Sequence, residues 1–419
     1  MKKLVKVVVM VTPLLGVIGC GDGLHQPINE TVKGGEVVVD FSAKEMKETL
    51  VAKKLVSNDT NVYGYKAYKI PYITTDEEGN EVKVSGLLVI PPKLHDKVSP
   101  YGGLSMVSDD HGTIFANKEA PTVIAANQST PDGSAIFLTS LGGFATLQPD
   151  YIGFGDSSDH YHPFILKKSL ANATVDFIKQ VKIFAADNNI KLNDQLFLTG
   201  YSEGGYAAMA TLKKIEDEQL TDLTVTMAAP MAGPYVMKGL ADAVLNSTQI
   251  AIPSFMANVG YAYSKVYNQD IETVINEPYA SKLPTLFNGS LIRTEIDPQL
   301  THATTGATGL FTQTFVTDYK NNAENWFAKA STENNLHLWK PKTPLRLVHC
   351  KGDTVIPYSI SQGTYRAMKQ LNSSANVALV PVEETLGLPT LVNHGSCGAL
   401  AYKVTTGMFA QVRKTTKGY

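Results

Sequence analysis

The sequence predicts an α/β fold, in which a mostly parallel sheet carries helices on both faces and a helical insertion. Two observations predict it. From residue 103 onward strand-like apolar runs alternate with helix-like segments, and one interval, 233–342, breaks that rhythm. The 419 residues are 43% hydrophobic and 18% charged, which suits a globular protein with a sizeable core. We therefore expect one α/β core, with its first part at 37–232 and its second part at 343–419.

The N-terminal segment has the pattern of an export signal. Three lysines among the first six residues precede an apolar stretch at 7–18, which is too short to read as a membrane-spanning helix. The end of this stretch, Val-Ile-Gly-Cys, resembles a bacterial lipobox, in which the cysteine is acylated and becomes the new N-terminus. We expect a signal peptide at 1–19, lipidation of Cys20 and a flexible tether at 20–36. A plain signal peptide cut nearby and an uncleaved anchor are the alternatives.

The elements ahead of the alternation read as a helix followed by a hairpin. Residues 43–55 have apolar side chains at helical spacing. Strand-like runs follow at 63–74 and 81–90, and the turn signal Asp-Glu-Glu-Gly-Asn at 76–80 separates them. This arrangement predicts an antiparallel hairpin.

The alternating region supplies the remaining core elements. Strands are expected at 104–107, 144–148, 195–199, 223–229, 345–350 and 377–382. Helices are expected at 134–141, 166–186, 205–215 and 359–371. Ser359 is the expected N-cap of the last of these helices.

The interval at 233–342 is far longer than a normal crossover connection and is rich in aromatic residues. We interpret it as a cap over the loops that follow the strands. An apolar lining in such a cap would bury an acyl or alkyl group and exclude water. The alternative, which we expect to hold for more than half of the aromatic residues, is that they form the core of the cap itself.

The most informative motif is Gly-Tyr-Ser-Glu-Gly-Gly at 200–205, a G-x-S-x-G pattern between a predicted strand and a predicted helix. A chain of this composition contains such a pattern by chance with a probability on the order of one in ten, so its context decides. Strand, sharp turn and helix form the setting of a nucleophile elbow, and Ser202 is therefore the candidate nucleophile.

Two further candidates follow in the chain order nucleophile, acid, base. Asp353 comes after an apolar strand that runs into a Gly-Asp turn, and His394 comes after the last predicted strand. A histidine that takes the serine proton, with an aspartate that holds its tautomer, would make Ser202 reactive. His349 is expected to be a packed core residue, and Asp150 a structural carboxylate in a turn.

A tetrahedral oxyanion needs preorganised N–H donors. We expect one from the backbone of Glu203, whose side chain looks exposed and receives no other role. The second is expected from Gly112 or Thr113, and the sequence does not decide between them. His111, Tyr201 and His162 are expected at the rim of the substrate pocket. The Asp and His spacings at 156–162 also suit a metal ion, but no third ligand set stands out, so we expect none.

The chain contains three cysteines. With Cys20 assigned to lipid, Cys350 and Cys397 are left as one possible pair, each three residues from a catalytic candidate. A disulfide between them would brace the acid and base loops, and an exported location permits it. Two buried free thiols are the alternative.

In these residues the chain resembles the α/β-hydrolase superfamily. The resemblance rests on four motifs in order, at 147–155, 200–205, 352–358 and 394–395, and extends from Tyr63 to the C-terminus. Within it, the chain is similar to secretory lipases and bacterial lipoprotein esterases. The resemblance implies an α/β-hydrolase fold with a helical cap, and carboxylic ester hydrolysis through an acyl-enzyme without metal or organic cofactor. The second glycine of an HGGG-type oxyanion loop is absent, which argues against bulky tertiary-alcohol substrates.

We carry three functions forward. The first is a serine carboxylesterase or lipase acting on a small-molecule or lipid ester. The second is a serine exopeptidase of the same fold, in which Glu272, Glu277 or Glu295 would hold a peptide amine. The third is a non-catalytic, hydrolase-like binding lipoprotein.

Bulk charge and the N-terminal signal bear on partners and location. A net charge of −2 without a basic run argues against nucleic acid. The expected location is the bacterial cell envelope, periplasmic or on the outer surface, with a membrane contact through the lipid. The sequence leaves the oligomeric state open.

Overall fold

The computed structural model describes residues 30–92, 102–127 and 133–416. The predicted signal peptide and Cys20 lie outside the described residues. The end of the expected tether is structured: β1 (Glu30–Val32) pairs antiparallel with β2 (Gly35–Phe41). Residues 30–32 and 35–36 of the predicted tether thus belong to the sheet.

In the described part of the chain, ten strands form one sheet in the order β1-β2-β3-β4-β6-β5-β7-β8-β9-β10. The remaining strands are β3 (Tyr65–Thr75), β4 (Glu81–Ile90), β5 (Leu104–Asp110), β6 (Ala145–Pro149), β7 (Leu192–Tyr201), β8 (Val225–Met231), β9 (Leu345–His349) and β10 (Val377–Pro381). Strands β1 to β4 pair antiparallel, and β4 pairs antiparallel with β6. The strands β6, β5, β7, β8, β9 and β10, in sheet order, run parallel to one another, as predicted.

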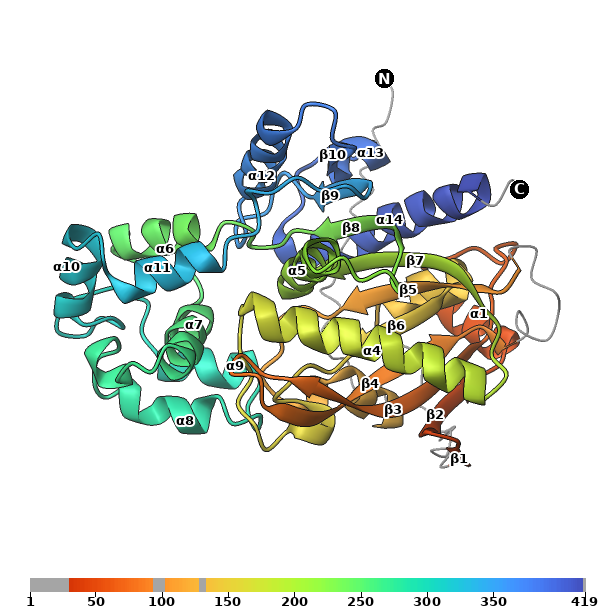
Figure 1. The fold of residues 1–419 in the computed structure, drawn as a ribbon, viewed down its shortest axis with the longest axis horizontal. Helices are drawn as coiled ribbons and strands as arrows, with labels where there is room; N and C mark the ends of the chain where they lie inside the picture. The colour runs from red at the N-terminus through yellow and green to blue at the C-terminus, as the bar shows by residue number, and fades with distance from the viewer. Residues whose placement is uncertain (1–29, 93–101, 128–132, 417–419) are drawn as a thin grey trace, which may run out of the picture.

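Helices cover both faces of this sheet (Figure 1). One face carries α4 (Lys167–Asp187), α5 (Glu203–Asp217) and α12 (Tyr358–Leu371), whose apolar side chains belong to the largest core cluster. The other face carries α1 (Ala43–Ala52) and α14 (His394–Thr416), which belong to two separate clusters. Two shorter helices, α3 (Pro121–Asn127) and α13 (Val382–Leu386), complete the core.

The strand register brings the loops of the predicted site to one edge. Asp110 at the end of β5 lies opposite Gly200 on β7, and Met231 at the end of β8 lies opposite both Tyr201 and Val348. Because the carboxyl ends of parallel strands meet at the same edge, the loops after β5, β7 and β9 lie close together.

The helix predicted at 134–141 is present as a short π-helical segment at Ile136–Leu141. One local prediction was wrong in detail. The N-cap of α12 is Pro357, because the helix begins at Tyr358, so Ser359 already lies within its first turn. Proline fits there since the N–H groups at a helix start have no intrahelical partner.

The interval between β8 and β9 contains helices that group together to one side of the sheet, at the left of Figure 1. They are α6 (Met237–Asn246), α7 (Pro253–Val266), α8 (Leu283–Leu286), α9 (Arg293–Ile296), α10 (Gln313–Asn321) and α11 (Trp326–Glu333). Several of their aromatic rings pack on one another, with Phe327 contacting Tyr263, Phe315 and Trp326. The limits of the cap, at 233 and 342, stay a prediction. Among the described residues, no helix is both long and apolar enough to cross a membrane.

Candidate active site

Ser202 lies at the sharp turn between β7 and α5. Its backbone has φ 61° and ψ −119°, a conformation that costs a non-glycine residue about 1–3 kcal/mol. The turn requires glycine on its helical side: a Cβ atom at Gly204 would lie 1.8 Å from the carbonyl oxygen of Asp110, and one at Gly205 would lie 2.2 Å from that of Met231. The sequence therefore forms the expected strand–turn–helix elbow, which lifts the serine above the sheet edge.

The structure brings the three candidates for nucleophile, base and acid together. His394 is the first residue of α14, and its Nε2 lies 3.0 Å from Oγ of Ser202. Its Nδ1 lies 2.5 Å from Oδ2 of Asp353, in the loop after β9. The imidazole thus links two groups that are far apart in the chain, in the geometry that proton transfer from a serine requires.

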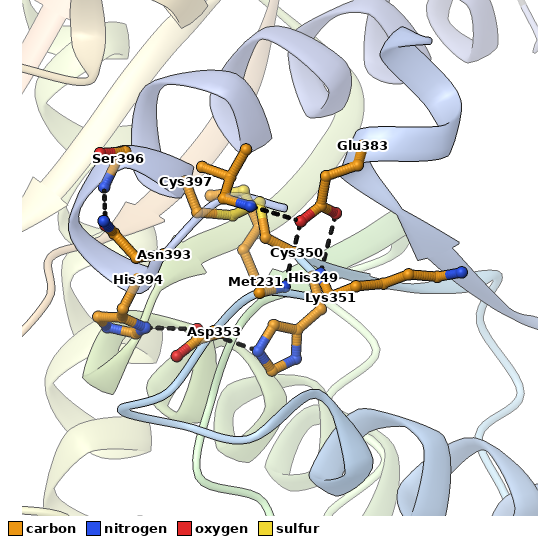
Figure 2. The surroundings of a disulfide bond; sticks show 12 residues. Met231, His349, Cys350, Lys351, Asp353, Glu383, Asn393, His394, Ser396 and Cys397 are labelled. Atoms are coloured by element: carbon orange, nitrogen blue, oxygen red, sulfur yellow. Dashed lines mark hydrogen bonds and ion pairs between the residues drawn. A yellow bond between two sulfur atoms is a disulfide. The ribbon is translucent and has the colours of Figure 1, made fainter. Parts of the chain in front are cut away.

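The Asp353 carboxylate is held on both oxygens. Oδ1 accepts the backbone N–H groups of Val355 and Ile356, each at 2.9 Å. Oδ2 lies between two imidazoles, those of His394 and His349, as Figure 2 shows. Burial acts to raise the pKa of Asp353, but the hydrogen bonds from the two histidines outweigh it and hold this pKa well below its usual range.

The acid and base loops are joined by two braces. The expected disulfide between Cys350 and Cys397 is present, and it links the residue after β9 to the first turn of α14 (Figure 2). The buried carboxylate of Glu383 accepts the N–H groups of Lys351 at 2.9 Å and Gly352 at 3.2 Å from one loop, and that of Val392 at 3.0 Å from the other.

Sequence reasoning missed Glu383. Burial acts to raise its pKa, but the backbone donors dominate and lower it. Its only signal was an acidic residue directly after the last strand.

The oxyanion candidates lie beside Ser202. Glu203 is the first residue of α5, where N–H groups have no intrahelical partner. The backbone of Gly112 packs so closely that a Cβ atom there would lie 3.7 Å from Cβ of Ser202. Thr113 lines the same cavity as Ser202 and Glu203. The structure therefore assembles all three predicted residues around the serine, and the choice between Gly112 and Thr113 stays open.

The expectation of an exposed Glu203 side chain was wrong. This side chain is 1% exposed, and its Oε1 lies 2.8 Å from Nε2 of His162. The opposite ring nitrogen of His162 donates to the carbonyl of Ile152 at 2.8 Å. Glu203 is the first residue of α5, where the helix dipole favours an acidic side chain, and the contact with His162 gives this buried side chain a polar partner next to the nucleophile.

The three residues predicted at the pocket rim contact the surrounding loops, and their place at the rim stays a prediction. Both ring nitrogens of His111 face backbone carbonyls, those of Gly112 and Asp150. The Tyr201 hydroxyl donates to the carbonyl of His394 at 2.7 Å, and His162 pairs with Glu203. Among the described residues that line the cavity of Ser202, none of these three appears. The described residues also contain no cluster of three or more His, Cys, Asp or Glu side chains with metal-binding geometry.

A largely apolar cavity opens beside Ser202. It contains about 860 Å³ of space not filled by protein atoms, space open to solvent included. Helix α6 contributes Leu240, Ala241 and Val244, and helix α7 contributes Phe255, Met256 and Val259. Such a lining favours an apolar ligand group, because polar groups would lose hydration there without gaining partners.

Asp150, after β6, has the structural role expected of it. Its carboxylate accepts the Ser85 hydroxyl at 2.6 Å, and the backbone N–H and hydroxyl of Thr122 at 3.0 Å and 2.5 Å. Burial raises the pKa of Asp150 to about 6, although these hydrogen bonds act in the opposite direction.

Comparisons with known proteins agree with this architecture. A model of the prolyl oligopeptidase family matches residues 132–218, which include the elbow but neither the Asp353 loop nor the His394 loop. No curated protein matches the chain at a significant level.

Solved structures resemble the chain over nearly its whole length. A protein from Legionella pneumophila superposes with a TM-score of 0.77 at 24% identity, covering 91% of this chain and 97% of its own. The rice cell wall degrading esterase LipA from Xanthomonas oryzae has a TM-score of 0.73 at 23% identity, covering 91% and 96%. Candida antarctica lipase A in its closed state has a TM-score of 0.60 at 17% identity, covering 90% and 81%. The chain therefore has the α/β-hydrolase fold.

Proposed function

We propose that this chain is a serine carboxylic-ester hydrolase that works through an acyl-enzyme. The observation that carries the proposal is the continuous contact from Ser202 through His394 to Asp353, at 3.0 Å and 2.5 Å. An unactivated serine is a poor nucleophile, so a base in this position is what the chemistry needs.

In the proposed reaction, Oγ of Ser202 attacks the ester carbonyl while Nε2 of His394 takes its proton. The N–H of Glu203, with a second donor from Gly112 or Thr113, stabilises the tetrahedral oxyanion. The imidazolium then donates its proton to the leaving alkoxide, which departs as the alcohol. Water, deprotonated by His394, attacks the acyl-serine and releases the acid. Asp353 holds the imidazole tautomer and stabilises its protonated form.

The apolar cavity supports an acyl group with a hydrocarbon chain. Each methylene buried there contributes about 0.8 kcal/mol of binding, so longer acyl chains gain affinity until the cavity is full. The Xanthomonas oryzae relative is an esterase and the Candida antarctica relative a lipase, which agrees with this substrate class.

The match to the prolyl oligopeptidase family favours a second candidate, a serine exopeptidase. That reading needs a carboxylate to hold the substrate amine. The cap residues considered for it, Glu272, Glu277 and Glu295, are exposed and do not line the cavity of Ser202. We therefore place ester hydrolysis first.

One experiment separates these functions. The full chain, purified in detergent, is assayed with p-nitrophenyl esters of increasing acyl length and with aminoacyl anilides. We expect turnover of the esters with an optimum in chain length, and loss of at least about a thousandfold in kcat on Ser202→Ala, because a triad member acts as part of a unit.

The surface variant Ser373→Ala is the matched control and should behave as the parent. Activity of Ser202→Ala within about tenfold of the parent contradicts the nucleophile assignment. Turnover of anilides alone would support the exopeptidase. Absence of turnover by the parent on both esters and anilides would support the non-catalytic binding protein.

We also propose that the mature chain is a lipoprotein of the bacterial cell envelope, exported by residues 1–19 and anchored through an acylated Cys20. The support for this is the lysine-rich, apolar and Gly-Cys pattern alone. Mass spectrometry of the N-terminal peptide tests it, and an unmodified Cys20 in the membrane fraction would contradict it.

A further inference from the structure

Asp353 has a second histidine partner that the reaction above does not use. His349 is the last residue of β9, and its side chain is fully buried. Its Nε2 lies 3.1 Å from Oδ2 of Asp353, the same oxygen that contacts His394, and 3.0 Å from the carbonyl of Ile356. In Figure 2, Asp353 lies between the two imidazoles.

The hydrogen positions on His349 follow from its partners. The carbonyl of Ile356 can only accept, so Nε2 carries a hydrogen that it shares between this carbonyl and Asp353. Nδ1 faces the hydroxyl of Ser361, a buried residue of α12, at 2.7 Å. The hydroxyl can donate to Nδ1, so the Ser361 contact suits a ring that carries its hydrogen on Nε2.

Five side chains therefore form one chain of contacts: Ser361, His349, Asp353, His394 and Ser202. A second serine–histidine pair lies on the buried side of Asp353 and mirrors the reactive pair. Both nitrogens of the buried imidazole are satisfied, and this is the condition under which a polar group can be buried without a large loss of stability. A residue needed only to fill space at the end of β9 would not require it.

We propose that His349, oriented by Ser361, is a positioning residue that acts on His394 through Asp353. The proposal rests on the proposed function, since it assigns His394 as the base. By donating to Oδ2, His349 fixes the carboxylate and takes up part of its capacity to accept. The bond from His394 to that oxygen is thereby weakened, and the imidazole gives up its proton more easily.

The surroundings of His349 are consistent with this role. The edge of the Tyr358 ring from α12 lies against it at 5.6 Å between ring centroids. Asp353 is the charged group in contact with it, and Ser361 and Ile356 supply the other polar contacts. A substitution at His349 therefore acts first on the Asp353 carboxylate.

Three variants test this positioning role of His349. His349→Phe keeps a buried ring and removes the donor, whereas His349→Gln keeps an N–H close to the position of Nε2. Ser361→Ala removes the group that orients the ring. His302→Phe, in the cap, is the control for loss of a histidine away from Asp353; His302 is exposed, and its Nδ1 donates to the carbonyl of Ile250.

The readouts are kcat, KM and the pH dependence of kcat/KM on a p-nitrophenyl ester. For His349→Phe we expect kcat to fall by about 10- to 100-fold with KM within about threefold of the parent, because binding is untouched. The acid limb of the profile should move to higher pH by about half a unit or more, because a carboxylate freed from one donor stabilises protonated His394 more strongly. His349→Gln should return both kcat and the acid limb most of the way to the parental values. Ser361→Ala should lower kcat and raise the acid limb as His349→Phe does, but by less.

A merely structural role gives a different pattern. If His349→Phe loses thermal stability while the acid limb stays at the parental pH, or if His349→Gln fails to restore the profile although it folds, the proposal is overturned. Folding is checked by circular dichroism and thermal melting of each variant against His302→Phe.

A second measurement separates this proposal from the proposed function. NMR of chains carrying ¹³C-labelled histidine follows the titration of His394 directly, with its signal assigned through His394→Gln. The titration midpoint should lie at higher pH in His349→Phe than in the parent, whether or not the parent hydrolyses esters. Equal His394 midpoints in His349→Phe and the parent would overturn the positioning role of His349. A parent that hydrolyses no ester, together with shifted midpoints, would overturn only the assigned reaction.

Discussion

At the scale of single residues, burial decides how several carboxyl groups behave. Asp353 and Asp150 lie at loops of the same sheet edge, yet their pKa values move in opposite directions. Asp353 receives hydrogen bonds from two imidazoles and two backbone N–H groups, which hold it ionised. At Asp150 the loss of hydration outweighs the hydrogen bonds from Ser85 and Thr122.

The raised pKa of Asp150 predicts a pH dependence of stability. The native state binds this proton more tightly than the unfolded chain, in which an aspartate titrates near 3.9. The stabilisation is therefore complete below pH ~4 and is lost as the pH rises through about 6. Asp150→Asn cannot ionise, so its free energy of unfolding should vary less between pH 4 and 7, by roughly 3 kcal/mol at most.

Urea unfolding at several pH values measures this difference. Burial also raises the pKa of Asp109 to about 6, but Asp109 is present in both proteins and its effect cancels in the comparison. Asp222→Asn on the surface should leave the pH dependence unchanged. Parallel curves for Asp150→Asn and the parent would contradict the prediction.

At the scale of elements, the catalytic candidates depend on how β9 and α14 are tied together. Asp353 lies in the loop after β9, and His394 is the first residue of α14. The disulfide and the Glu383 carboxylate join the two loops directly. We expect these braces to matter for stability and for the alignment of His394 with Asp353.

Removal of the disulfide should lower thermal stability. The closed loop spans 47 residues, for which the chain-entropy relation gives about 4 kcal/mol, or about 5 °C in Tm for a protein of this size. Scanning calorimetry of the Cys350→Ser, Cys397→Ser double variant, with and without reductant, measures it. On reduction, the Tm of the parent should fall toward that of the variant. An unchanged Tm, with two titratable thiols before reduction, would contradict the disulfide.

At the scale of the whole molecule, the insertion between β8 and β9 supplies most of what Ser202 faces. The core positions the reacting groups, and helices α6 and α7 supply much of the apolar lining. Acyl selectivity is therefore expected to depend on the insertion, while the chemistry depends on the core.

A cavity-filling substitution tests this division. Ala241→Phe on α6 should shorten the cavity and reduce kcat/KM for an octanoyl ester by about 200-fold, because roughly four methylenes lose their burial. The acetyl ester should change by no more than about threefold. Ala243→Phe, on the exposed face of the same helix, is the matched control. An equal loss on both esters would show that the insertion affects the chemistry itself.

Much of the fold was predictable because it depends on local signals. Period-two and helical patterns located the strands and helices of the core, and the Gly-rich motif at 200–205, between a predicted strand and a predicted helix, identified the elbow. Predictions failed where the partner lay far away in the chain. Glu203 looked exposed until His162 was placed against it, and no local signal marked Glu383 as the acceptor for two loops.

The sequence by itself determined the α/β class, the elbow around Ser202 and the order of the candidates Asp353 and His394, because each depends on patterns within a short stretch of chain. Only the tertiary structure decided which side chains meet. It placed His349 on Asp353, Glu203 on His162 and the aliphatic residues of α6 and α7 beside the serine. These contacts depend on the register of parallel strands and on long-range packing, which bring together residues that no local pattern relates.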